Sequence, residues 1–242
     1  MENNPPWSSG PGEILRHGLS LLKEDSDTNR RLAMICIDNS VELMIKTFLG
    51  LPERITGIKV PRKKYEELSE NFPKLLDGLE EFASDKIKGI NLGEIEWYHR
   101  LRNELYHQGN SLTVERNNVQ VYSEIANVLF DNLFGFKLVP KSEDENAILG
   151  HFMQAWINFE KTVTNLSFVI DEKSRKPMDA TNFLMESNKI KTEEIERLNK
   201  IRKIRNEVVH GKVNYKEVIK KGDIIFLNKL TSYIEGRIIE LE

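Results

Sequence analysis

Apolar residues recur at helical spacing through most of the chain, and glycine and proline divide this pattern into separate elements. The clearest example is the segment from Arg30 to Leu49, whose apolar residues form one stripe that must be buried. Asp27, Thr28 and Asn29 supply capping residues before it, and Gly50 follows it.

The same criteria predict helices elsewhere in the chain, with Thr113 and Thr192 as caps of two of them. The further predicted helices cover residues 13–23, 61–83 (one helix, or two separated at Phe72-Pro73), 94–107, 113–134, 147–170, 179–187, 192–210 and 215–241, the last interrupted at Gly222-Asp223. Alternating strand patterns are absent from the sequence, so the predicted fold class is all-α.

Residues 137–146, with the sequence KLVPKSEDEN, interrupt the helical pattern. They are polar, contain Pro140 and show no apolar period, which is typical of a linker. A chain of 242 residues is long enough for two small domains of about 100–150 residues. We therefore expect one domain over residues 1–140 and a second over residues 146–242.

Two segments, one on each side of this linker, resemble each other. The first is EIEWYHRLRNELYHQGN (residues 94–110) and the second is RLNKIRKIRNEVVHGKV (residues 197–213). Their alignment gives four identical pairs: Arg102 with Arg205, Asn103 with Asn206, Glu104 with Glu207, and His107 with His210. The flanking apolar positions match as well, and a long amphipathic helix precedes each copy. We interpret this as an internal duplication of a helical domain.

Helical geometry groups the polar residues of each motif. At about 100° per residue, Asn103 and His107 share one face and Arg102 flanks them. Leu101 and Leu105 point to the other side, where a core can hold them. The same calculation applies to the second copy. Each helix is thus expected to present an arginine, an amide and an imidazole on a polar face.

These residue types suit the cleavage of a phosphodiester bond in RNA. Arginine binds a phosphate and stabilises its developing charge, and histidine transfers protons near neutral pH. The 2′-hydroxyl of RNA is a built-in nucleophile, so neither a protein nucleophile nor a metal is required. One histidine can remove its proton while the other protonates the leaving 5′-oxygen, a contribution of typically about 10²–10⁴-fold.

The duplicated motif resembles the signature of the HEPN superfamily, R-x(4–6)-H with a polar residue often following the arginine. The resemblance is clearest over residues 28–135 and weaker over residues 146–242. It implies two helical bundles packed face to face as a pseudo-dimer, with metal-independent endoribonuclease activity that leaves 2′,3′-cyclic phosphate ends. Such proteins commonly act as toxins or in antiviral defence.

The resemblance also assigns roles to individual residues. It implies Arg102, His107, Arg205 and His210 as catalytic residues, with Asn103 and Asn206 in support. Some HEPN toxins carry a tyrosine two residues after the histidine that a partner nucleotidyltransferase modifies. Gly109 and Lys212 occupy these positions here, which argues against that form of regulation.

Three further residues are candidates for contact with the substrate. His99 lies near the motif face, Arg202 is its counterpart in the second copy, and Lys203 belongs to a Lys- and Arg-rich stretch over residues 189–221. Such a stretch attracts polyanions although the net charge is −3. The alternative is a solvated helix face that is merely rich in lysine.

Composition limits the remaining function classes. With 39% apolar and 30% charged residues, the chain has the make-up of a globular protein. Cys36 is the single cysteine, which excludes an intramolecular disulfide and fits a reducing cytoplasm. The sequence shows no secretory signal, membrane-spanning run, metal-ligand spacing or glycine-rich phosphate loop, so we expect a cytoplasmic location, no cofactor and no metal.

Alternative interpretations of the motifs stay open at this point. The arginines and histidines can instead pair with Glu104, Glu207 or the opposite copy, in a structural subunit or a non-catalytic HEPN module that binds RNA, a nucleotide or a partner protein. A ribonuclease in the cytoplasm would harm its host, so we expect an inhibitor or an activating protein. The two copies meet either within one chain or across a homodimer.

Overall fold

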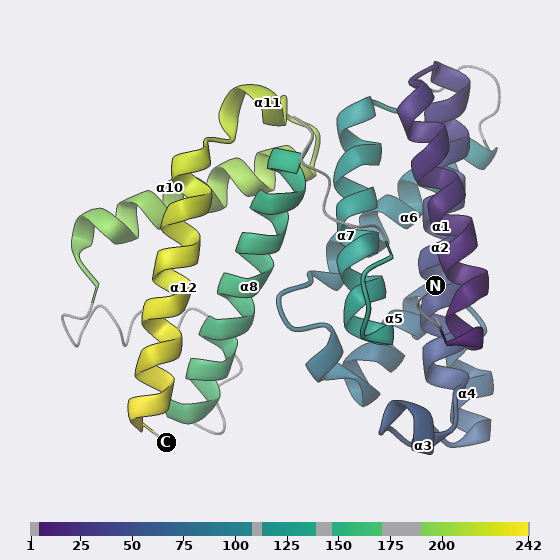
Figure 1. Cartoon of the computed structure of the whole chain (residues 1–242). Helices are drawn as coiled ribbons and strands as arrows, with labels where there is room; N and C mark the ends of the chain where they lie inside the picture. Colours follow the sequence, from purple (N-terminus) through teal and green to yellow (C-terminus); the bar gives the residue numbers. More distant parts are fainter. Residues whose placement is uncertain (1–4, 108–112, 139–146, 171–189, 242) are drawn as a thin grey trace. The chain divides into compact units, whose positions relative to one another are not determined.

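The computed structural model of the chain describes residues 5–107, 113–138, 147–170 and 190–241 (Figure 1). It divides into two compact units, Met1–Lys141 and Ser142–Glu242, each of which is described by itself. Every regular element among the described residues is a helix, which confirms the predicted all-α class. The predicted helix over residues 179–187 and most of the predicted linker lie outside the described residues.

Unit 1 is built around one central helix, α2. Its elements are α1 (Pro6–Glu24), α2 (Asp27–Gly50), α3 (Glu53–Thr56), α4 (Arg62–Leu68), α5 (Phe72–Phe82), η1 (Ser84–Lys86), α6 (Leu92–His107) and α7 (Arg116–Phe134). Helix α2 contacts α1, α5, α6 and α7. Its fully buried side chains, including Met34, Ile37, Val41 and Ile45, therefore form the core of the unit.

Helix α1 begins earlier than predicted and packs closely on α2. Pro6 is its first residue, a position where the missing N–H of proline costs nothing. At Gly18, an added Cβ would lie 3.1 Å from the Cβ of Cys36. The hydroxyl of Ser40 in α2 donates to the carbonyl of Pro11 at 2.7 Å. The glycine- and proline-rich segment from Pro6 to Gly12 is thus the first part of a packed helix.

Several helix boundaries differ from those predicted. The hydroxyl of Ser26 caps α2 by accepting from the N–H of Asn29. The segment 61–83 forms two helices, and the side chain of Asn71 caps the second by accepting from the N–H of Lys74. Helix α7 begins at Arg116 and not at Thr113.

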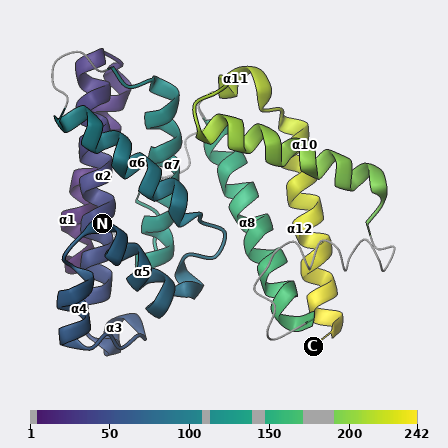
Figure 2. The same cartoon turned by 180° about the vertical axis from the view of Figure 1, so that it is seen from behind.

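Unit 2 contains two long helices that pack along each other, α8 (Ala147–Ile170) and α12 (Lys221–Leu241) (Figure 2). The motif helix α10 (Thr192–Val209) lies between them in the chain, followed by the short helix α11 (Tyr215–Val218). Lys191 is the N-cap residue of α10 in place of Thr192, and its N–H donates to the side chain of Glu194. The predicted interruption of the last helical region falls at residues 219–220, three residues early.

In both units the motif helix lies in the chain between two long helices that pack against each other. Helix α6 lies in the chain between α2 and α7, which pack against each other, and α10 lies between α8 and α12. The units share this arrangement and differ elsewhere, since α3, α4, α5 and η1 precede α6 in unit 1 and α11 follows α10 in unit 2.

Candidate functional site

The arginine of each motif lies on the buried stripe of its helix. In α6, Ile95, Tyr98 and Leu105 are buried at spacings of three and seven residues, and Arg102 lies in line with them. The side chain of Arg102 is only 16% exposed. In α10, Leu198, Ile201 and Val208 occupy the equivalent positions in line with Arg205.

This placement corrects the expectation that the arginines lie on a polar face. Arg205 is 5% exposed, whereas Leu101 and Ile204, which were expected in the core, are only half-buried. The reason in unit 1 is an acceptor in the interior that receives the arginine, a feature that helical angles alone do not reveal.

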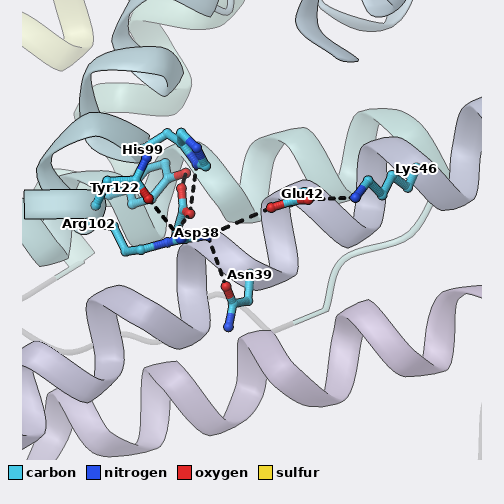
Figure 3. Close-up of polar contacts among 8 residues, drawn as sticks. Asp38, Asn39, Glu42, Lys46, His99, Arg102 and Tyr122 are labelled. Atoms are coloured by element: carbon cyan, nitrogen blue, oxygen red, sulfur yellow. Dashed lines mark hydrogen bonds and ion pairs between the residues drawn. The ribbon is translucent and has the colours of Figure 1, made fainter. Parts of the chain in front are cut away.

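That acceptor is Asp38, a fully buried carboxylate on α2 (Figure 3). Three side chains bond to it. The hydroxyl of Tyr122 in α7 donates to Oδ1 at 2.8 Å. The Nε of Arg102 donates to Oδ2 at 2.7 Å, and Nδ1 of His99 lies 3.0 Å from the same oxygen. A buried carboxylate requires such compensation, and Asp38 thereby joins α2, α6 and α7.

The remaining contacts of Arg102 fix the plane of its guanidinium. One terminal nitrogen donates to the side-chain oxygen of Asn103 at 2.9 Å, and the other donates to that of Asn39 at 3.2 Å. A carboxylate oxygen of Glu42 lies 3.7 Å from the second nitrogen, and Lys46 donates to the other oxygen of Glu42 at 2.6 Å. Arg102 is therefore positioned by residues of α2 and of its own helix.

The imidazole of His99 is held by two contacts. Nδ1 faces Asp38, and the ring stacks on Phe72 of α5 with centroids 3.9 Å apart and planes inclined by 8°. The side chain is 14% exposed. His99 therefore reaches the rim of unit 1 in a defined orientation beside Arg102.

Tyr122 acts as a permanent donor to Asp38. Burial and the negative charge of Asp38 raise the pKa of Tyr122 well above its ordinary value, so the phenol keeps its proton. Its ring stacks on that of Tyr98, with centroids 4.5 Å apart. Both rings help to fix α7 against α6.

In unit 2 the motif residues fall on two sides of α10. Arg205 is buried, whereas Asn206 and His210 are exposed. His210 is the residue after the last helical one, and its backbone N–H donates to the carbonyl of Asn206 at 3.1 Å. The histidine therefore stands at the C-terminal end of the helix, where a positive charge is favoured.

The other basic residues of α10 have different surroundings. The guanidinium of Arg202, the counterpart of His99, lies over the ring of Trp156 at 6.0 Å. Lys203 is exposed, with its amine 3.9 Å from Glu207. Arg197 donates to the carbonyl of Gly222 at 2.9 Å and so helps to pack α10 against the start of α12. Part of the basic stretch therefore stabilises the fold.

Only some of the predicted site residues lie in contact with one another in the described structure. Arg102, Asn103 and His99 meet around Asp38 in unit 1. His107 is the last residue of α6, and its side chain lies outside the described part of the structure, as does Gly109. The motif of α10 belongs to the other unit and is described separately from them.

Sequence reasoning missed Asp38, although a signal for it exists. Asp38 follows Met34 by four residues and precedes Val41 by three, so it falls on the buried stripe of α2. A carboxylate at a core position needs a hydrogen-bonding or charged partner, and a cationic side chain on a neighbouring helix usually provides it.

Within residues 5–107, 113–138, 147–170 and 190–241, no group of three or more His, Cys, Asp or Glu side chains is arranged to hold a metal ion. The helices of these ranges include none long and apolar enough to cross a bilayer.

No known protein family, curated protein or solved structure matches the chain. The resemblance to the HEPN superfamily therefore rests on the duplicated motif itself.

Proposed function

We propose that the chain is a metal-independent endoribonuclease whose active site combines Arg102 and His107 of unit 1 with Arg205 and His210 of unit 2. The observation that carries the proposal is the repeated geometry of the two motif helices. In each, an arginine lies on the buried stripe and a histidine lies five residues later, at the C-terminal end of the helix.

The arrangement around Arg102 supports a role in phosphate binding. A guanidinium has five N–H donors, and the bonds to described acceptors use three of them, on Asp38, Asn103 and Asn39. The terminal nitrogens can each offer one more to a phosphate oxygen. Because the planar group is already fixed, little conformational entropy is lost when a phosphate binds.

In the proposed reaction, a histidine removes the proton of the 2′-hydroxyl, and the 2′-oxygen attacks the adjacent phosphorus. The bond to the 5′-oxygen breaks, and the other histidine protonates that oxygen. The products are a 2′,3′-cyclic phosphate and a 5′-hydroxyl. The arginines neutralise the charge that accumulates on the phosphate oxygens.

The biological setting belongs to the same proposal. A cytoplasmic ribonuclease of this kind fits a toxin or an antiviral defence effector, held in check by an inhibitor or released by an activating partner. The two motifs combine within one chain or across a homodimer.

A second function is favoured by one observation, namely that Arg102 bonds to acceptors of its own unit. An arginine that neutralises buried Asp38 also fits a non-catalytic module that binds RNA, a nucleotide or a partner protein. On this alternative, substitution of Arg102 lowers stability and no RNA is cut.

The test is incubation of the purified chain with total RNA in EDTA, followed by analysis of the product ends. We expect cyclic phosphate ends from the parent protein and loss of cleavage in Arg102→Lys, because an ammonium cannot replace the fixed guanidinium fork. Arg100→Lys is the matched control, since Arg100 is 64% exposed on the same helix. Cleavage that survives Arg102→Lys, or that disappears in EDTA, contradicts the proposal.

A further inference from the structure

His99 occupies a position that the duplicated motif does not explain. It lies three residues before Arg102 on α6, and its counterpart in unit 2 is an arginine, Arg202. The contacts of its ring nevertheless define its orientation, its tautomer and its neighbour.

The tautomer follows from the acceptor. A carboxylate bonded by Arg102 and Tyr122 accepts hydrogen bonds and does not donate them, so Nδ1 of His99 carries the hydrogen that faces Asp38. In a neutral imidazole, the lone pair then belongs to Nε2, which is directed away from Asp38. Nε2 is therefore the atom able to accept a proton.

Charge neutralisation alone does not require His99. The negative charge of Asp38 is balanced by Arg102 at 2.7 Å, and that of Glu42 by Lys46 at 2.6 Å. These four side chains carry no net charge. A neutral imidazole thus completes the hydrogen bonding of Asp38 without being needed as a cation.

The position of the ring relative to Arg102 is equally defined. Nδ1 of His99 and Nε of Arg102 both lie within hydrogen-bonding distance of Oδ2 of Asp38 (Figure 3). The stack on Phe72 fixes the plane of the imidazole, and the contact with Asp38 fixes which edge of the ring faces the interior. A proton acceptor and a phosphate-binding group are therefore held side by side, as an active site requires.

We propose that His99 is a catalytic residue that accepts the proton of the 2′-hydroxyl, and that Asp38 is the residue that positions it. This inference rests on the proposed ribonuclease function. Nε2 takes the proton as the bond from the 2′-oxygen to phosphorus forms. The bond to the 5′-oxygen breaks, and one motif histidine protonates the departing oxygen while the other binds the phosphate. The phosphate lies on Arg102 throughout.

The substitution His99→Asn separates this role from a structural one. An asparagine amide places an N–H near the position of Nδ1 and can still donate to Asp38, but it has no nitrogen that titrates. A residue needed only to satisfy Asp38 would be replaced by it with little effect. His17→Asn is the matched control, because His17 is exposed on α1 of the same unit.

The experiment measures single-turnover cleavage of a single-stranded RNA oligonucleotide in EDTA between pH 5 and pH 9. We expect His99→Asn to lower the rate by about 10²–10⁴-fold and to remove the acidic limb of the pH profile. RNA binding and the thermal unfolding temperature should stay close to those of the parent protein, and His17→Asn should behave as the parent.

The charged and titratable groups around His99 influence the acidic limb of the pH profile. They are Asp38 and Glu42 with Lys46 from α2, Arg102 from its own helix, and Tyr122 from α7, whereas Phe72 contributes an uncharged ring from α5. Of these, only Asp38 bonds directly to the imidazole. Asp38→Asn should therefore lower the cleavage rate, because the amide no longer accepts hydrogen bonds at both positions and the imidazole loses its fixed orientation.

The outcomes distinguish this inference from the proposed function. If the parent protein cuts the oligonucleotide and His99→Asn cuts it within about threefold at every pH, the role of His99 is refuted and the ribonuclease proposal stands. If the parent cuts no RNA, both are refuted. Should His99→Asn not fold, His99→Gln is measured in the same way. Chemical shifts of the ring nitrogens in the parent protein must then show the hydrogen on Nδ1 and the lone pair on Nε2.

Discussion

Asp38 ties three helices of unit 1 together through three different kinds of donor: a phenol, a guanidinium and an imidazole. A buried carboxylate that loses one donor keeps its charge but loses part of its compensation. The stability of unit 1 and the order of the candidate site therefore depend on the same atoms.

Replacement of Tyr122 by phenylalanine removes one of these donors with little change of shape. We expect Tyr122→Phe to lower the free energy of unfolding by about 1–3 kcal/mol, because the buried Oδ1 of Asp38 loses its bond. Urea unfolding monitored by circular dichroism measures the difference. Tyr106→Phe serves as the control, since Tyr106 is 67% exposed. Equal losses in both variants would contradict this account of Asp38.

At the residue scale the sequence predicted the motif but not its environment. Arg102, Asn103 and His99 could be proposed from their spacing on one helix. Asp38 lies 64 positions before Arg102, so its pairing depends on how α2 packs against α6. Helical angles describe a single helix and carry no information on its neighbour, which is why the burial of the arginines was not anticipated.

At the scale of elements, long amphipathic helices were predicted well because each buries a continuous stripe. Helix α8 has the predicted ends, and α6 begins two residues before the predicted start. Caps were less predictable. The N-cap residues of α7 and α10 are Glu115 and Lys191, where the sequence predicted Thr113 and Thr192. Short elements such as α3 and η1 have no periodic signal to detect.

Helix α1 extends from Pro6 to Glu24, beyond the predicted residues 13–23, and Gly18 within it permits close packing on α2. An added methyl group at Gly18 would meet Cβ of Cys36 and Cγ1 of Ile37 at 3.1 Å. Gly236 is exposed on α12, and no described neighbouring side chain lies within 4 Å of a Cβ added there. These two helical glycines therefore differ in what surrounds them.

We expect opposite effects of alanine at these two positions. Gly236→Ala should raise the free energy of unfolding by up to about 1 kcal/mol through higher helix propensity. Gly18→Ala should lower it by about 1 kcal/mol or more, because α1 and α2 must separate. Thermal or urea unfolding of both variants measures the change in the free energy of unfolding. Stabilisation by Gly18→Ala would mean that the helices are not closely packed there.

Glu124 on α7 introduces a dependence of stability on pH. Burial raises the pKa of Glu124 from 4.5 to about 7, so the folded state favours the protonated carboxyl. The stabilising contribution of the protonated form is complete below about pH 4.5 and is lost as the pH rises to about 7.

Glu124→Gln should therefore stabilise the protein only at higher pH. We expect a gain of roughly 1–3 kcal/mol at pH 8, where the parent must hold a buried carboxylate, and little difference at pH 4. Urea unfolding at the two pH values measures it. The exposed Glu115 gives the control Glu115→Gln. A gain that is the same at both pH values would show that the carboxyl is not responsible.

At the scale of the whole molecule, the sequence predicts a duplication because both copies keep the same four residues at the same spacing. In the structure, the arginine of each copy lies in line with the buried stripe of its motif helix. How duplicated domains pair depends on surface side chains outside the motif, so the sequence supports the combined active site only as a hypothesis.

The most direct test of that hypothesis compares the rates at which His107→Ala, His210→Ala and the variant with both substitutions cleave one RNA. The rates are measured in EDTA under single-turnover conditions. Residues that act together on one reaction have non-additive effects. A combined site predicts that each single substitution lowers the rate by about 10²–10⁴-fold and that the double variant is scarcely slower than either. If each single variant keeps about half of the activity and only the double variant is inactive, the two motifs act separately and the combined site is wrong.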